Sequence, residues 1–179
     1  TYGKDYISWS VSFTEPWLGG KKPNALTTSY SHSLYTNRLP KSDTNYASFI
    51  IDGVTVGIGK RLTWPDDFFT LYQGINFQRY KLKNYATIFP IGSGTGVYHN
   101  INYEINLGRN SISQPIYPRS GSDISLGLEL TPPYSLFSDK DYSTLGDNDK
   151  YKWIEYHKWK AKAYWYFELM DKLVLATKL

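Results

Sequence analysis

Apolar and polar residues alternate with a period of two along most of the chain, which is the pattern of β-strands that have one apolar face. The clearest case is residues 100–107, where Ile101, Tyr103, Ile105 and Leu107 alternate with three asparagines and Glu104. The pattern predicts further strands at residues 7–13, 26–34, 54–58, 69–77, 124–130 and 151–169, and a last one from 172 onward. We therefore expect an all-β chain of about eight antiparallel strands.

The polar positions of these strands are not those of a soluble protein core. In the first strand they are Ser8, Ser10 and Ser12, and later strands place Asn, Gly and Lys there. Strands that alternate in this way can face lipid on one side and a polar lumen on the other. The pattern therefore predicts a transmembrane antiparallel β-barrel.

The connections between the predicted strands alternate in character. One edge of the predicted sheet has turns, at residues 15–23, 65–67, 110–121 and 170–171. The other edge has polar, Tyr-rich loops, and one of these loops contains the Gly-rich residues 92–96. Short turns are periplasmic in such barrels and long loops are extracellular. We expect one aromatic girdle at the turn edge and a second at the loop edge. The girdle at the turn edge would contain Trp17, Trp64 and Trp165. The girdle at the loop edge would contain Tyr35, Tyr46, Tyr80, Tyr98 and Tyr151.

Composition agrees with a barrel and excludes several other classes. Aromatic residues make up 17% of the 179 residues, yet mean hydropathy is only -0.47, as expected when only alternate residues face lipid. The absence of cysteine excludes disulfides and thiolate metal sites. The net charge is +4, but Lys and Arg form no basic stripe, so we expect no nucleic-acid partner.

No residues stand out as a catalytic, cofactor-binding or metal-binding site. His32, His99 and His157 lie on or beside different strands without metal-ligand spacing. Asp66 and Asp67 follow Pro65, which is typical of a turn rather than of a catalytic carboxylate pair. We therefore predict no enzyme activity and no cofactor.

Charged residues on the polar face leave two interpretations open. Glu104 and Glu129 could form a network with Lys158, Lys160 and Lys162 that stiffens the wall. Alternatively, each could be solvated separately in a water-filled lumen, because exposed ion pairs contribute only about 0–1 kcal/mol.

Three segments resemble the BamA family of outer-membrane protein assembly factors, in its Bacteroidetes type. They are Phe-Thr-Glu-Pro-Trp-Leu-Gly-Gly at 13–20, Ile-Tyr-Pro-Arg-Ser-Gly-Ser at 116–122 and Thr-Pro-Pro-Tyr-Ser-Leu-Phe at 131–137. Their order and spacing also match. The resemblance spans nearly the full length of the chain.

The resemblance implies that residues 1–179 are part of one barrel domain of about 16 strands. The chain would cover roughly the fourth to eleventh strands, with POTRA domains and the remaining strands outside it. The start at Thr1 also suggests that residues are missing upstream. The family's seam strands and its loop motif Val-Arg-Gly-Phe/Tyr have no counterpart here, so no site residue can be carried over.

The implied function is that of the core component of the outer-membrane β-barrel assembly machinery, in the cell outer membrane. Its partners would be nascent outer-membrane proteins, accessory lipoproteins of the BAM complex, outer-membrane lipid and lipopolysaccharide. One alternative is a related outer-membrane pore or two-partner secretion transporter. A second is a soluble lipocalin-like binding barrel, which would keep its apolar residues inside.

Overall fold

The computed structural model describes residues 3, 5–20, 24–86, 94–137 and 143–179. The strands are β1 (Tyr6–Glu15), β2 (Asn24–Thr36), β3 (Ser48–Arg61), β4 (Phe69–Lys83), β5 (Gly96–Asn110), β6 (Gly121–Leu130), β7 (His157–Met170) and β8 (Leu173–Lys178). Two 3-10 helices, η1 (Leu18–Gly20) and η2 (Tyr134–Phe137), and one short helix, α1 (Asp147–Lys150), lie in the connections. None of the helices in these ranges is both long and apolar enough to cross a membrane.

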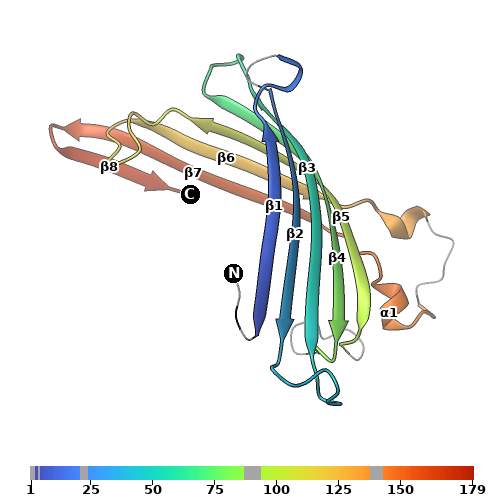
Figure 1. Cartoon of the computed structure of the whole chain (residues 1–179). Helices are drawn as coiled ribbons and strands as arrows, with labels where there is room; N and C mark the ends of the chain where they lie inside the picture. Colours follow the sequence, from blue (N-terminus) through green and yellow to red (C-terminus); the bar gives the residue numbers. More distant parts are fainter. Residues whose placement is uncertain (1–2, 4, 21–23, 87–93, 138–142) are drawn as a thin grey trace.

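The eight strands form one antiparallel sheet in chain order from β1 to β8 (Figure 1). Each strand therefore pairs with its neighbours in sequence, as in an up-and-down barrel wall. β1 and β8 are not paired with each other, so the sheet is open. The prediction of an all-β antiparallel chain is confirmed.

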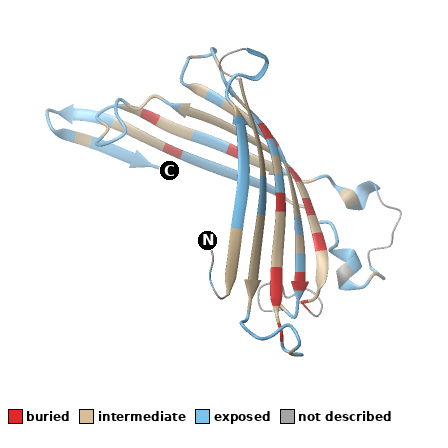
Figure 2. Ribbon diagram, in the orientation of Figure 1, coloured by how far each residue is buried: buried red, intermediate tan, exposed pale blue. Residues whose placement is uncertain are grey.

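The sheet has a crowded polar face and an open apolar face. On the polar face Asn100 and Asn102 are only 3% and 5% exposed, whereas on the apolar face Val56 and Ile75 are 47% and 57% exposed. Side chains converge on the concave side of a curved sheet and diverge on its convex side. The polar face is therefore concave and the apolar face convex. Figure 2 shows the buried positions as separate patches along the strands.

Two glycines allow the ring of Tyr72 to lie against the concave face. A Cβ on Gly57 or Gly74 would fall well inside van der Waals contact with the Tyr72 ring. Gly59 is two residues away on the same face, and a Cβ there would meet nothing within 4 Å. The glycines at 57 and 74 therefore leave room for the ring in this position, whereas Gly59 has no such contact.

The last long strand begins later than predicted. The alternation predicts a strand from residue 151, but β7 starts at His157. β6 ends at Leu130 opposite Tyr103, so the loop-side end of β5 has no β6 partner. The segment around Trp153 takes that place through an isolated parallel bridge with His99. The His99 N–H donates to the Lys152 carbonyl over 2.8 Å, and the His99 carbonyl accepts the N–H of Ile154 over 3.0 Å.

Candidate functional site: a barrel wall with a polar and an apolar face

Away from the loop edge, the concave face of β1, β2 and β3 carries mainly small polar side chains. Ser8 lies opposite Ser33, and their hydroxyls are 3.0 Å apart. Serine, threonine and glycine continue this surface across β2 and β3. Because these side chains are short, this part of the wall projects little into the enclosed space.

The concave face of β4 and β5 carries a ladder of amides around one carboxylate. The Asn76 amide donates to Asn102 over 2.9 Å and to Glu104 over 3.1 Å, and Asn106 donates to Glu104 over 2.6 Å. Asn100 and Asn102 in turn donate to the hydroxyl of Tyr156, over 3.4 and 3.2 Å. Since Tyr156 ends the connection between β6 and β7, this ladder fixes the base of that loop to the wall.

The charged network that was one of the two interpretations is present only in part. Lys160 forms an ion pair with Glu129, and the Tyr156 hydroxyl donates to the same carboxylate over 3.4 Å. The Glu104 carboxylate is instead held by asparagines, and Lys162 lies over the Tyr164 ring at 4.7 Å. The Lys160 side chain is 54% exposed, so solvent screens the pair and its contribution is small.

Three of the tyrosines predicted for the loop-side girdle face the lumen instead. Tyr35, Tyr80 and Tyr98 pack with a cluster whose buried members include Phe49 and Leu82. Tyr35 lies in register with Phe49 on the face of Ser33, which is the concave face. The remaining two, Tyr46 and Tyr151, precede β3 and follow α1 respectively. The prediction was wrong because it used closeness to the loops and ignored the alternation of faces.

The convex face carries an apolar band with polar or charged residues at both borders. On β5 the outward residues between His99 and Arg109 are Ile101, Tyr103, Ile105 and Leu107. Ten residues separate the two borders, which at about 3.4 Å per residue and a tilt of 35–45° gives a height of about 24–28 Å. This matches the apolar band of about 25 Å in outer-membrane barrels.

Aromatic rings do gather at the loop-side border of the convex face. His99 stacks on Phe77 with ring centroids 6.0 Å apart, and Trp153 follows at 5.0 Å. Tyr134 of η2 lies 5.0 Å beyond Trp153. Burial raises the pKa of the Tyr134 phenol, and the charge of Glu155 raises it further. This row, and not the predicted tyrosines, has the position of a loop-side girdle.

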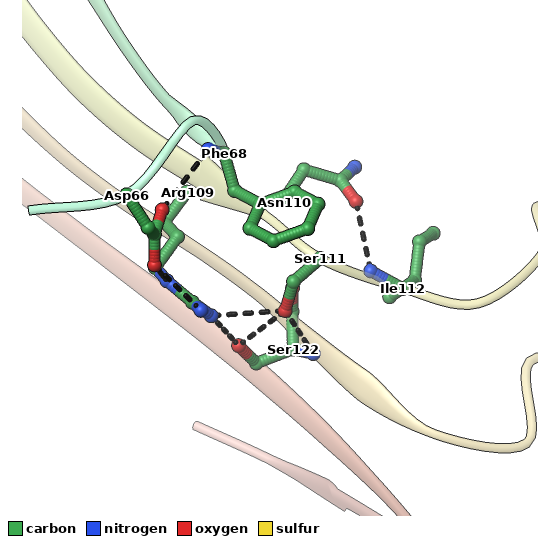
Figure 3. A network of polar contacts seen from close by, with 7 residues as sticks. All are labelled: Asp66, Phe68, Arg109, Asn110, Ser111, Ile112 and Ser122. Carbon is green, nitrogen blue, oxygen red and sulfur yellow. Dashed lines mark hydrogen bonds and ion pairs between the residues drawn. The ribbon is translucent and has the colours of Figure 1, made fainter. Parts of the chain in front are cut away.

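At the turn edge, Arg109 joins the β3–β4 turn to the β5–β6 turn (Figure 3). Its guanidinium contacts the Asp66 carboxylate at 2.9 Å and donates to the hydroxyls of Ser111 and Ser122 over 2.9 and 2.7 Å. It also lies over the ring of Phe68 at 5.6 Å. The two turns are thereby held together on the convex side.

The turn between β3 and β4 uses both predicted aspartates. Asp66 accepts the backbone N–H of Phe68 over 2.9 Å, and the Asp67 carbonyl accepts the Arg61 Nε–H over 2.6 Å. Both residues therefore have the turn role predicted for them. No pattern in the sequence indicates the contact between Asp66 and Arg109, because the two residues are far apart in the chain.

The three histidines remain apart in the structure. His32 lies 2.7 Å from the Asp52 carboxylate on the convex face, His99 is in the aromatic row, and His157 begins β7. Within the described ranges, no group of three or more His, Asp or Glu side chains is arranged to hold a metal ion. The structure brings no predicted site residues together, since none was predicted.

A model of the Omp85 superfamily domain matches residues 1–179. The chain belongs to the Omp85 superfamily. Members of this superfamily are outer-membrane β-barrel proteins that serve in protein insertion or transport. The concave polar face and the convex apolar band are thus the lumen side and the lipid side of an Omp85 barrel wall. A comparison with curated proteins found no match.

Among solved structures, this Omp85 chain is similar to BamA from Haemophilus ducreyi lacking POTRA domains 1–3. The TM-score is 0.65 at 20% sequence identity, and the match covers 98% of this chain and 32% of the other. At that identity the likeness establishes the fold alone. The chain spans about a third of the length of the matched BamA chain.

Proposed function

We propose that this chain forms central wall strands of the core component of the outer-membrane β-barrel assembly machinery, which folds and inserts outer-membrane proteins. The observation that carries the proposal is the superfamily match over residues 1–179. The similarity to a BamA barrel over nearly the whole chain supports the same conclusion. In this proposal residues 1–179 belong to one barrel domain, whose other strands and POTRA domains come from the rest of the protein.

The proposed mechanism rests on the high cost of unpaired backbone groups in lipid. Each unsatisfied N–H or C=O costs several kcal/mol there, so an exposed strand edge at an open seam would favour pairing with an incoming strand. β2, β3 and β4 are paired with both neighbours along almost their whole length and offer no such edge. This segment would therefore act as the continuous wall, while the seam lies elsewhere in the barrel.

The two edges of the wall would meet different partners. Turns such as that of Asp66 would face the periplasm, where accessory lipoproteins and nascent outer-membrane proteins arrive, and the long loops would face the exterior. The convex band would contact outer-membrane lipid, including lipopolysaccharide. The protein would reside in the cell outer membrane, and no step in this role requires a catalytic residue or a cofactor.

A related pore or two-partner secretion transporter is the second candidate, because a polar lumen face such as that of Ser8 and Asn100 also suits a conducting barrel. The lipocalin-like alternative requires apolar side chains inside the barrel. Here Val56 and Ile75 lie on the exposed convex face, and the chain belongs to a superfamily of outer-membrane proteins. The lipocalin interpretation is therefore abandoned.

Reconstitution of the complete protein into neutral-lipid vesicles tests the proposal. A urea-denatured outer-membrane barrel protein is added, and its folding is followed by the mobility shift of folded barrels in unheated gels. We expect faster folding than with empty vesicles or with vesicles that contain an unrelated porin. Ion conductance without faster folding would contradict the assembly role and favour the pore.

A further inference from the structure

Three cations lie in a column on the outward side of β4 at its loop-side end. Arg79, Lys81 and Lys83 occupy alternate positions, so their side chains emerge from the same face. Arg79 is in register with Asp52 and with His99, which places the column on the convex face. It begins directly beyond Phe77, the last apolar residue on the convex face of β4.

The column has no acidic partner in the described part of the chain. Asp52 is opposite Arg79, but its carboxylate lies 2.7 Å from His32 and also accepts the Tyr30 hydroxyl over 3.3 Å. Among the described residues, no ion pair within 4.0 Å involves Arg79, Lys81 or Lys83. Like charges about 7 Å apart along a strand repel one another, so the column is electrostatically suited to an anion.

Arginines at the turn edge are different. Arg109 is paired with Asp66 at 2.9 Å, and Arg119 lies 3.4 Å from Glu168. At the turn border of the convex face Arg109 is thus neutralised, and Lys60 of β3 has no ion pair among the described residues. At the loop border three cations stand together in the column. This asymmetry matches a membrane whose two leaflets present different headgroup charge.

Aromatic groups beside the column fix its height relative to the membrane. Phe77 stacks with His99, which contacts Trp153, and the Lys83 ammonium lies 5.4 Å over the Tyr46 ring. Aromatic residues settle at the level of the lipid headgroups. The cations above Phe77 are therefore positioned where phosphate groups of the outer leaflet lie.

We propose that Arg79, Lys81 and Lys83 form a binding site on the barrel exterior for the phosphate groups of a phosphorylated outer-leaflet lipid. This site rests on the proposed placement of the loop edge at the cell exterior. Arg79 offers the forked donors that suit phosphate oxygens, and the two lysines add point charges. Basic residues at an anionic membrane surface act roughly additively, so the three together should strengthen binding about 100-fold at low ionic strength, and less as salt screens them.

Native mass spectrometry of the complete protein in neutral detergent can measure this preference. The two probes are bis-phosphorylated lipid A and the same acylated disaccharide without its phosphates. The test variant carries Arg79→Gln, Lys81→Gln and Lys83→Gln. The matched control carries Lys60→Gln, Lys158→Gln and Lys162→Gln, which removes the same charge from positions outside the column.

The wild-type protein and the control should prefer the phosphorylated lipid, and the test variant should lose most of that preference. A test variant that kept the full preference would overturn the site. A third variant, Arg79→Lys with Lys81→Arg and Lys83→Arg, keeps the charge and should keep the preference. If the test variant failed to fold, absence of any phosphate preference in the wild-type protein, or its loss in this charge-preserving variant, would overturn the site.

The result is separable from the proposed assembly function. Faster barrel folding in neutral vesicles without a phosphate preference would remove the lipid site and leave the assembly role. A phosphate preference without faster folding would support the lipid site and contradict the assembly role.

Discussion

The two faces of the sheet are built from alternate residues of the same strands, yet they follow opposite packing rules. Val56 and Ile75 are apolar and exposed, whereas Asn100 and Asn102 are polar and buried. In a water-soluble protein such an exposed apolar face would favour association, but here the solvent of the convex face is lipid. The buried asparagines are hydrogen-bonded and so can be accommodated. The solvent expected at each face, rather than burial, therefore explains which residues occupy it.

A charge placed on either face provides the strongest test of this difference. Val56 faces outward near the middle of the apolar band and Thr55 faces inward beside it. Val56→Lys should destabilise the complete barrel in bilayers by about 2–4 kcal/mol, whereas Thr55→Lys should change stability by less than about 1 kcal/mol. Urea unfolding in vesicles measures both, and equal losses would contradict the assignment of the faces.

Steric crowding should differ just as clearly within the concave face. Gly57→Ala would place a methyl group against the Tyr72 ring and should cost about 1–3 kcal/mol, while Gly59→Ala has free space and should have little effect. The same unfolding assay compares the two variants. In a Tyr72→Ala background the cost of Gly57→Ala should nearly vanish; a cost that persisted would show that the ring is not its cause.

The turn edge of the wall offers a third comparison. Arg109→Gln removes a guanidinium that joins two turns through Asp66 and Ser122, and it should cost about 1–3 kcal/mol. Arg119 forms a looser and more exposed pair with Glu168, so Arg119→Gln should cost about 0–1 kcal/mol. Thermal unfolding of the two variants should separate them, and a reversed order would mean that Arg109 does not hold the turns together.

The smallest effect is expected at the ion pair of the lumen. Glu129→Gln removes the ion-pair partner of Lys160. Because the Lys160 side chain is exposed to solvent, which screens the pair, stability should change by no more than about 1 kcal/mol. The temperature at which the barrel loses its mobility shift in gels is a suitable measure. A loss above about 2 kcal/mol would instead favour the charged network that stiffens the wall.

The sequence predicted most of the fold because one face of every strand is apolar. Periodicity of two identified each of the eight strands and placed residues such as Ile105 and Ser31 on the correct faces. The same rule, applied strictly, would also have placed Tyr35 and Tyr98 on the lumen side, because they have the parity of Ser33 and Asn100. The error arose from assigning girdle residues by their distance from a loop.

Contacts between distant segments could not be predicted from the sequence. Residues 151–156 alternate like a strand, but Trp153 pairs with His99 because β6 is too short to cover the end of β5. Likewise, nothing in the chain indicates that Asp66 meets Arg109. Such pairings depend on the lengths and register of neighbouring strands, which a pattern of polar and apolar residues does not specify.

The contacts of Arg109 and Asn76 also disfavour a wall in which β4 and β5 pair in the wrong register. A slip of one residue between β4 and β5 would turn the apolar side chains of one strand into the lumen and its polar side chains toward lipid, which is unfavourable. A slip of two residues keeps every side chain on its proper face, and the alternation does not penalise it. Such a slip would move Asp66 about 7 Å along the strands relative to Arg109 and would place Asn76 opposite Asn100 or Glu104 instead of Asn102. These polar pairs, though individually weak, distinguish the correct barrel from a copy that differs only by a two-residue shift.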